Sequence, residues 1–249
     1  EIEILAKNRE RFEENNIIVL APSKNTASHC FDKYEMFCYL KENNIRTVLT
    51  YDSLEHFIEG YNNKEIDFPV FIKPRTGSGS VGIHKCTTME ELRSYFVEAK
   101  FDYIIQEFMD CEDCDADVYI DCYSHKPVAA FSKRKLETKI GGASKTISFK
   151  DQKLFDFIED ICQVLEFNGP VDMDFWYKDG QYYLSEVNPR FGGAYLHAYG
   201  AGVDFFKLIQ NNMNGITNKS IIGEYNEDIL MMMYDGVVII NKDELVDLD

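Results

Sequence analysis

The sequence predicts an α+β fold. Segments expected to form strands and helices follow one another without the strict alternation that a parallel sheet requires. Two pairs of strand-like segments are separated by short turns, which is typical of antiparallel hairpins. With 45% hydrophobic residues in 249, the chain can bury a substantial core, as one large domain or as two lobes with a cleft between them.

The first part of the chain mixes short helices and strands. Ile2, Leu5 and Phe12 can share one face of a helix, and a later short helix begins after Ser53, a residue that favours the helix cap. The elements expected here are a helix at 2–15, a strand at 17–21, a helix at 32–43, a strand at 46–51 and a helix at 52–61.

The rest of the chain is richer in strands. Asp179-Gly180 is a strong signal for a tight hairpin turn within residues 169–190. The other elements expected are strands at 68–74 and 83–88, a helix at 89–99, strands at 102–109, 116–124 and 126–135, helices at 150–167 and 204–214, and a last strand at 237–240.

Charge and cysteine content restrict the class of protein. The formal net charge of −17 opposes broad binding to nucleic acid or to an anionic membrane, and no apolar run reaches the length of a membrane span. Seven scattered cysteines suit a reducing cytosol, so we expect a soluble cytoplasmic protein. Cys111 and Cys114 form a CxxC without a second pair, and we interpret them as two ordinary thiols.

A glycine-rich loop follows the strand at 68–74. Gly77 to Gly82 reads GSGSVG and satisfies GxGxxG, which alone is weak evidence of nucleotide binding. A Rossmann loop would be followed by a helix, and here a strand is expected; a P-loop would need GxxxxGK[ST], which is absent. A protein kinase would need HRD and DFG motifs, and its lysine follows the loop, whereas Lys73 precedes this one. A phosphate-covering flap between two strands and a plain hairpin turn both remain open.

Acidic residues gather on the predicted hairpin at 169–190. Asp172 and Asp174 lie two apart on its first strand, and Glu186 and Asn188 two apart on its second, so each pair shares a face. Antiparallel pairing can set Asp174 opposite Glu186. Facing carboxylates repel unless a cation neutralises them, and such oxygens are natural ligands for Mg²⁺. A solvated acidic face is the alternative.

Three stretches in this order resemble the ATP-grasp superfamily: FIKPRTGSGSVGI, IIQEFMDCEDCDADV and GPVDMDFWYKDGQYYLSEVNPRFGG. More narrowly, they are similar to the ATP-binding half-domain of the carbamoyl-phosphate synthase large subunit and to stand-alone carboxylate–amine ligases. The resemblance covers roughly residues 2–215 and implies two α+β lobes that grip ATP. It implies that residues 1–30 are the remnant of a preceding Rossmann-like domain and that residues 31–220 form the ATP-grasp domain. Within that domain, the lid lobe would cover about 46–105 and the larger lobe about 106–220. Residues 221–249 would be a C-terminal strand and an acidic tail.

The resemblance also implies roles for individual residues. The nucleotide would be bound by Lys33 and Lys73 at the phosphates, the flap residues Gly77, Ser78, Gly79 and Gly82, the adenine-binding hinge Glu107, Phe108 and Met109, and Asp113 at the ribose. The metal ligands would be Asp174, Glu186 and Asn188, and the catalytic cations Lys73, Arg134, Lys145 and Arg190, with Lys139 in the same basic stretch. Asp113 departs from the family's usual Glu at this position and is one methylene shorter.

The function implied is that of an Mg²⁺-ATP-dependent ligase, with Mn²⁺ as the alternative metal. A small-molecule carboxylate would be activated as an acylphosphate and captured by an amine, and a homodimer is compatible with this function. One alternative is phosphorylation of bicarbonate or carbamate, for which the chain is shorter than the usual two-step arrangement. A non-catalytic ATP-binding module is the other.

Overall fold

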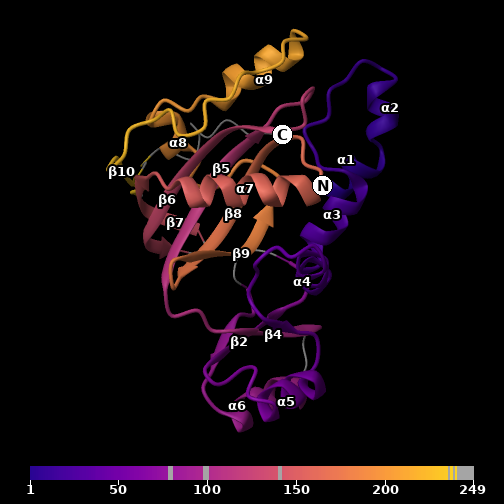
Figure 1. The fold of residues 1–249 in the computed structure, drawn as a ribbon, viewed down its shortest axis with the longest axis vertical. Helices are drawn as coiled ribbons and strands as arrows, with labels where there is room; N and C mark the ends of the chain where they lie inside the picture. The colour runs from indigo at the N-terminus through magenta and orange to yellow at the C-terminus, as the bar shows by residue number, and fades with distance from the viewer. Residues whose placement is uncertain (78–80, 98–100, 140–141, 235, 238, 240–249) are drawn as a thin grey trace.

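The chain folds into two antiparallel sheets, each with its own hydrophobic core (Figure 1). The structure is a computed structural model and describes residues 1–249 except 78–80, 98–100, 140–141, 235, 238 and 240–249. Its helices are α1 (Ile2–Lys7), α2 (Arg9–Glu13), α3 (Lys24–Phe31), α4 (Lys33–Glu42), α5 (Leu54–Asn62), α6 (Met89–Val97), α7 (Gln152–Val164), α8 (Leu196–Gly200) and α9 (Phe205–Met213). Its strands are β1 (Thr50–Tyr51), β2 (Val70–Pro74), β3 (His84–Cys86), β4 (Tyr103–Glu107), β5 (Glu112–Ile120), β6 (Pro127–Lys139), β7 (Gly142–Phe149), β8 (Gly169–Lys178), β9 (Gln181–Asn188) and β10 (Leu230–Met232).

The smaller lobe is built on the sheet β1-β4-β2-β3. Figure 1 shows α5 and α6 side by side at the lower end of the molecule, over this sheet. Their apolar side chains pack with those of the strands into one buried cluster that includes Phe57, Val70, Ile72, Leu92 and Ile105. The lobe therefore has a core of its own, separate from that of the larger sheet.

The larger lobe is built on the sheet β10-β7-β6-β5-β8-β9, with α7 lying across one face (Figure 1). Alternation along β5 sends Cys114, Ala116 and Val118 into the core that α7 covers. The residues between them, including Asp115 and Asp117, therefore point to the opposite face. This face is the one that carries the polar site.

Several predicted elements differ from those observed at the start of the chain. The single helix expected at 2–15 is two short helices, α1 and α2, because Asn8 leaves helical geometry with φ −112° and ψ 13°. The strand expected at 17–21 does not form. Val19 and Ala21 are buried there, but the chain packs beside residues 166–168 through single hydrogen bonds and has no ladder partner.

The strand expected at 46–51 is reduced to Thr50–Tyr51 in β1. Its first residues lie instead beside β9, where the Leu184 amide donates to the Arg46 carbonyl at 3.0 Å. Ser53 caps α5 as predicted, accepting from the His56 amide at 3.2 Å. Helices α3 and α8 and the strand β7 were not predicted.

The end of the chain also differs from the prediction. The strand expected at 237–240 includes residues 238 and 240, which lie outside the described residues. The last strand observed is β10, which pairs with β7 through Leu230 and Ile147. Within the described part of the chain, no helix is long and apolar enough to span a membrane.

Candidate functional site

A cavity of about 320 Å³ opens between the two lobes. Four basic and four acidic side chains from both lobes line it, so a charged ligand entering here meets both signs of charge. The basic residues are Lys33, Lys73, Lys135 and Arg190, and the acidic residues are Asp115, Asp172, Asp174 and Glu186. Asn188 adds a neutral amide.

The hairpin β8–β9 supplies the acidic wall. Its turn residues Asp179 and Gly180 have φ of 52° and 77°, as a type I′ turn requires. From the turn the strands pair without a break as far as Phe175 and Leu184, and a β-bulge next to Asp174 then sets Asp174 opposite Glu186 and Asp172 opposite Asn188. The cross-strand pairing of Asp174 and Glu186 expected from the sequence is therefore observed, with Asn188 two residues further along the same strand.

Lys73 supplies a buried positive charge from β2. Burial lowers the pKa of Lys73 to about 8, since the charged ammonium is poorly solvated there. Glu186 and Asp174 oppose this shift, and the nearby Lys33 adds to it. The carboxylates near Lys73 thus stabilise its ammonium only in part, and a bound anion would stabilise it further.

Lys33 and the glycine loop lie against each other. Lys33 is the first residue of α4, and its Nζ donates to the Gly77 carbonyl at 2.6 Å. Gly77 and Gly82 have φ of 105° and 75°, which residues with a side chain rarely adopt. Both lysines implied for the phosphates and the start of the loop therefore border one cavity, while Ser78 and Gly79 lie outside the described residues.

A family model described as an ATP-grasp domain matches residues 30–194, which include every one of these residues. The chain belongs to the ATP-grasp family. A curated relative is D-alanine–D-alanine ligase B of Clostridium perfringens, which is 28% identical over 216 residues, 79% of this chain and 71% of that protein.

Solved structures with low sequence identity share the fold of this chain. The biotin carboxylase domain of a Hydrogenobacter thermophilus 2-oxoglutarate carboxylase has a TM-score of 0.72 at 18% identity and covers 92% of this chain. N5-carboxyaminoimidazole synthetase of Staphylococcus aureus has a TM-score of 0.72 at 14% identity and covers 88%. The chain spans 54% and 61% of these two structures' lengths. The expected ATP-grasp family and α+β fold are thus confirmed.

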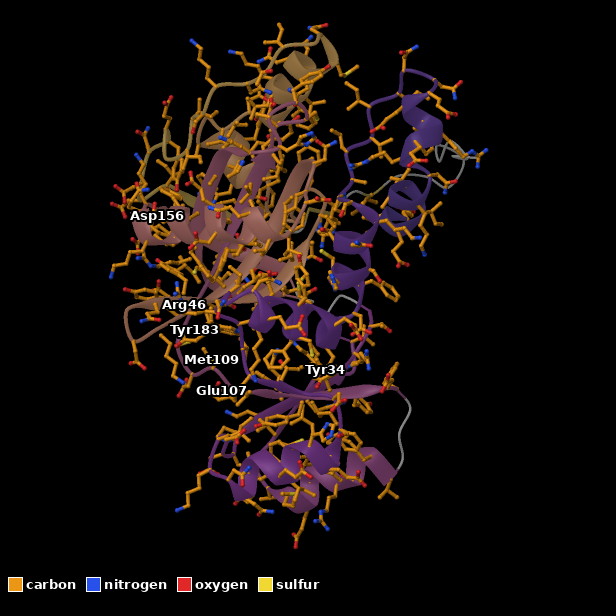
Figure 2. The ribbon with its side chains drawn as sticks, turned by 45° about the vertical axis from the view of Figure 1, so that its right-hand side comes forward. Tyr34, Arg46, Glu107, Met109, Asp156 and Tyr183 are labelled. Carbon is orange, nitrogen blue, oxygen red and sulfur yellow. The ribbon has the colours of Figure 1, made fainter. Side chains whose placement is uncertain are left out.

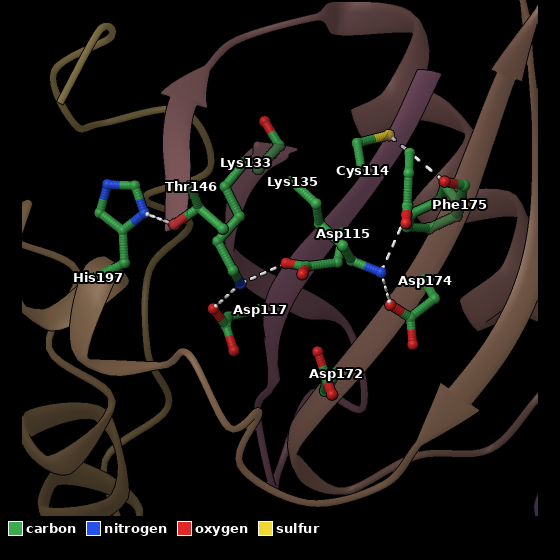
Figure 3. A network of polar contacts seen from close by, with 12 residues as sticks. Cys114, Asp115, Asp117, Lys133, Lys135, Thr146, Asp172, Asp174, Phe175 and His197 are labelled. Atoms are coloured by element: carbon green, nitrogen blue, oxygen red, sulfur yellow. Dashed lines mark hydrogen bonds and ion pairs between the residues drawn. The ribbon is translucent and has the colours of Figure 1, made fainter. Parts of the chain in front are cut away.

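The ATP-grasp site contains a cation that the sequence did not reveal. Lys135 on β6 lines the cavity and contacts two aspartates, Asp174 at 2.5 Å and Asp113 at 2.9 Å (Figure 3). Beside it, Lys133 is fully buried and pairs with Asp115 and, at 2.5 Å, with Asp117. The two-residue spacing of these aspartates and lysines was the signal in the sequence that could have shown them to share one sheet face.

Arg134 and Lys145, predicted as catalytic cations, do not line this cavity. Arg134 points to the opposite face of β6, where it donates to Glu112 at 2.8 Å and lies over the Phe149 ring. Lys145 on β7 pairs with Glu137 at 2.6 Å. Alternate residues of a strand face opposite ways. On β6 the side chain that reaches the cavity is therefore Lys135, the next residue after Arg134.

The hinge expected to bind adenine joins the two lobes. Figure 2 shows Glu107 and Met109 where the chain passes from the smaller to the larger sheet. Glu107 accepts from Lys178 at 3.0 Å, Lys85 lies 3.6 Å from the centre of the Phe108 ring, and Met109 is buried. None of the three lines the 320 Å³ cavity, so the structure does not bring the expected hinge together with Lys33, Lys73 and the hairpin carboxylates in this cavity.

Asp113, which was expected to contact the ribose, forms an ion pair with Lys135 at 2.9 Å. Burial raises the pKa of Asp113, and the adjacent Lys135 opposes the shift. The CxxC thiols on either side of it are free, and burial raises the pKa of both Cys111 and Cys114. A raised pKa disfavours the thiolate, which agrees with two unreactive cysteines.

The loop after β9 lies against the buried carboxylate of Asp117 and the partly buried carboxylate of Asp172. A Cβ on Gly192 would lie 2.6 Å from Asp117 Oδ1 and 2.9 Å from Asp172 Oδ1, closer than real contacts allow. Arg190 in the same loop donates to Asp172 at 3.4 Å. Burial, and next the charge of Asp174, raise the pKa of Asp172 well above its usual range. The carboxylates thus fix the loop that carries Arg190.

We expect Gly192→Ala to destabilise the chain by about 1–3 kcal/mol, because the added methyl group overpacks the carboxylates. Gly193→Ala is the matched control, since a Cβ there meets nothing within 4 Å. Urea unfolding of both variants measures the difference. Equal unfolding midpoints for the two variants would show that the loop moves freely and is not fixed by Asp117 and Asp172.

Proposed function

We propose that this chain is the nucleotide-binding part of an ATP-dependent carboxylate–amine ligase. The single observation that carries the proposal is the cavity in which Lys33, Lys73 and Arg190 face the pair Asp174–Glu186. The cations suit a triphosphate, and the carboxylates suit the metal that accompanies it. D-alanine–D-alanine ligase, a relative by sequence, is a ligase by name.

The donor set fits Mg²⁺. Asp174, Glu186 and Asn188 offer two carboxylates and an amide oxygen, and Mg²⁺ typically takes one or two carboxylates together with substrate phosphates. Among the described residues, no group of three or more His, Cys, Asp or Glu side chains is arranged to hold a metal ion, at this hairpin or elsewhere, so substrate phosphates would have to complete the ligand set. Mn²⁺ accepts the same oxygen ligands. A bound divalent ion would neutralise charge as the phosphoryl group transfers.

The chain's own residues would then position the reactants. A substrate carboxylate oxygen attacks the γ-phosphorus, the bond to the bridging oxygen breaks, and ADP leaves with that electron pair. Lys73 and Arg190 hold the phosphoryl oxygens during this transfer. An amine nitrogen then attacks the acyl carbon, the carbon–oxygen bond breaks, and phosphate leaves while the nitrogen loses a proton. Positioning and charge perform this chemistry without a nucleophilic side chain.

The test is ADP release by the chain with Mg²⁺-ATP and a panel of carboxylate–amine pairs, with bicarbonate as a separate arm. Release that needs both an acid and an amine supports ligation. Release stimulated by bicarbonate alone supports the carbamoyl-phosphate synthase type of phosphorylation. Binding of ATP without release under every condition would overturn the proposal in favour of a non-catalytic module.

Two further features remain predictions. Residues 1–30, which include α1 and α2, are proposed to belong to a preceding Rossmann-like domain. The acid, the amine and the oligomeric state are properties of the whole protein, and a homodimer is part of the proposal.

Nucleotide affinity is expected to fall as the pH rises through about 8, the pKa of Lys73. The folded-state pKa lies below the usual value of 10.5, so Lys73 loses its charge early and with it the attraction for phosphate. The loss is up to about tenfold per pH unit until the pKa in the complex is passed. The same shift works in the opposite sense on folding: this group's contribution to the free energy of unfolding rises between pH 8 and 10.5.

Calorimetric titration of ATP between pH 7 and 9.5 measures this dependence. Lys73→Arg is the matched control, because a guanidinium stays charged over that range and its affinity curve should be flat. The same decline in both proteins would assign the pH dependence to another group.

A further inference from the structure

Lys135 holds one of the proposed metal ligands. Its Nζ lies 2.5 Å from Asp174 Oδ1 and 2.9 Å from Asp113 Oδ1, and its side chain is 13% exposed. Lys135 on β6 follows Arg134, which pairs with Cys114 on β5, and Asp174 on β8 pairs with Asp115, two residues along β5 from Asp113. Lys135 thus crosses β5 to reach Asp174 (Figure 3).

A divalent cation and Lys135 compete for the negative charge of Asp174. Mg²⁺ binds carboxylate oxygen at about 2.0–2.1 Å. With the ammonium 2.5 Å from the same oxygen, the two cations would lie within a few ångströms and repel. Within the part of the chain that the structure describes, no other Lys or Arg forms an ion pair with Asp174. Lys135 therefore neutralises the negative charge of Asp174 that a bound metal ion would otherwise neutralise.

Asp113 is a second carboxylate partner for the Lys135 ammonium. Asp113 Oδ1 lies 2.9 Å from Lys135 Nζ, so the ammonium can release Asp174 and keep one carboxylate partner. Lys135 also lines the cavity beside Lys73 and Gly77. A phosphate in that cavity would replace the partner that Lys135 gives up.

We propose that Lys135 is the resident counter-ion of Asp174 and is exchanged for the divalent ion when metal and nucleotide bind together. The inference rests on the proposed metal site. Metal alone must displace Lys135 without compensation and binds weakly. Nucleotide supplies phosphate oxygens for the displaced ammonium, so each ligand strengthens binding of the other.

The experiment titrates the full chain with Mn²⁺ alone at pH 7.5 and follows free Mn²⁺ by electron paramagnetic resonance. Lys135→Met removes the competing cation and is expected to tighten Mn²⁺ binding at least about fivefold, the lower end of typical coupling between sites. ADP should then strengthen Mn²⁺ binding less than it does in the original chain. Lys135→Gln, which keeps a hydrogen-bond donor of similar reach, should behave alike and covers a failure of the methionine variant to fold.

Lys207→Met is the charge-matched control, because it removes an exposed cation on α9 and should change Mn²⁺ affinity less than about twofold. Mn²⁺ affinity in both Lys135 variants equal to or weaker than that of the original chain overturns the exchange. Failure of the metal site itself looks different: Asp174→Asn would then leave Mn²⁺ binding unchanged in every background.

Discussion

Nucleotide binding is expected to lose its dependence on Mg²⁺ when Glu186 is replaced by glutamine. Glu186 lines the cavity, faces Asp174 across the β8–β9 hairpin, and lies close enough to Lys73 to raise its pKa. The substitution keeps the size of the side chain and removes its charge. Loss of even an indirect metal contact typically costs about 10–100-fold in affinity, and a direct ligand should cost at least that.

Calorimetric titration of ATP with and without Mg²⁺ measures the effect. The original chain should bind more tightly with Mg²⁺, and Glu186→Gln should show nearly equal affinities in both conditions. Glu55→Gln, an equal charge change at an exposed residue of α5, should behave like the original chain. If Glu186→Gln and Asp174→Asn both kept the full Mg²⁺ effect, the hairpin would not be the metal site.

Replacing Lys133 by methionine is expected to destabilise the chain by about 3–5 kcal/mol. Lys133 is fully buried and pairs with Asp115 and Asp117, which are also buried. Burial already raises the pKa of Asp115 to about 6, although Lys133 and Lys135 oppose the shift. Without Lys133, both carboxylates would be left without a partner charge in a poorly solvated place.

Urea unfolding at pH 7.5 and pH 5 tests this expectation. In Lys133→Met the folded-state pKa of Asp115 should lie above its unfolded value, so the deficit should shrink as the pH falls and Asp115 takes up a proton. Adding Asp117→Asn should recover part of the loss. Lys139→Met removes an exposed cation from the same strand and should cost less than about 1 kcal/mol. Lys133→Met as stable as the original chain would contradict a structural role for this network.

Features encoded over a few residues could be predicted from the sequence. The Asp179-Gly180 turn fixes the β8–β9 register as far as Phe175 and Leu184. Ser53 caps α5 because a capping side chain needs only the amide three residues later. The expected pairing of Asp174 with Glu186 is observed, but it is produced by a β-bulge next to Asp174 that the sequence did not indicate.

Features that depend on distant partners could not be predicted. Residues 17–21 have strand-like composition but no neighbouring strand, and β7 is held between β6 and β10, which comes some eighty residues later. Lys135 was missed because its contact with Asp174 requires β5 to lie between β6 and β8. That order of strands is a property of the fold, and no short motif carries it.

Thermal unfolding of the chain with Mg²⁺-ATP, with ATP in excess EDTA, and without ligand tests the central claim most directly. Ligand at about 100 times its dissociation constant should add roughly 2.7 kcal/mol to the free energy of unfolding. Mg²⁺-ATP should raise the melting temperature clearly, ATP in EDTA should raise it less, and Glu186→Gln should show no Mg²⁺-dependent rise. An unchanged melting temperature in all three conditions would contradict a nucleotide site between these lobes.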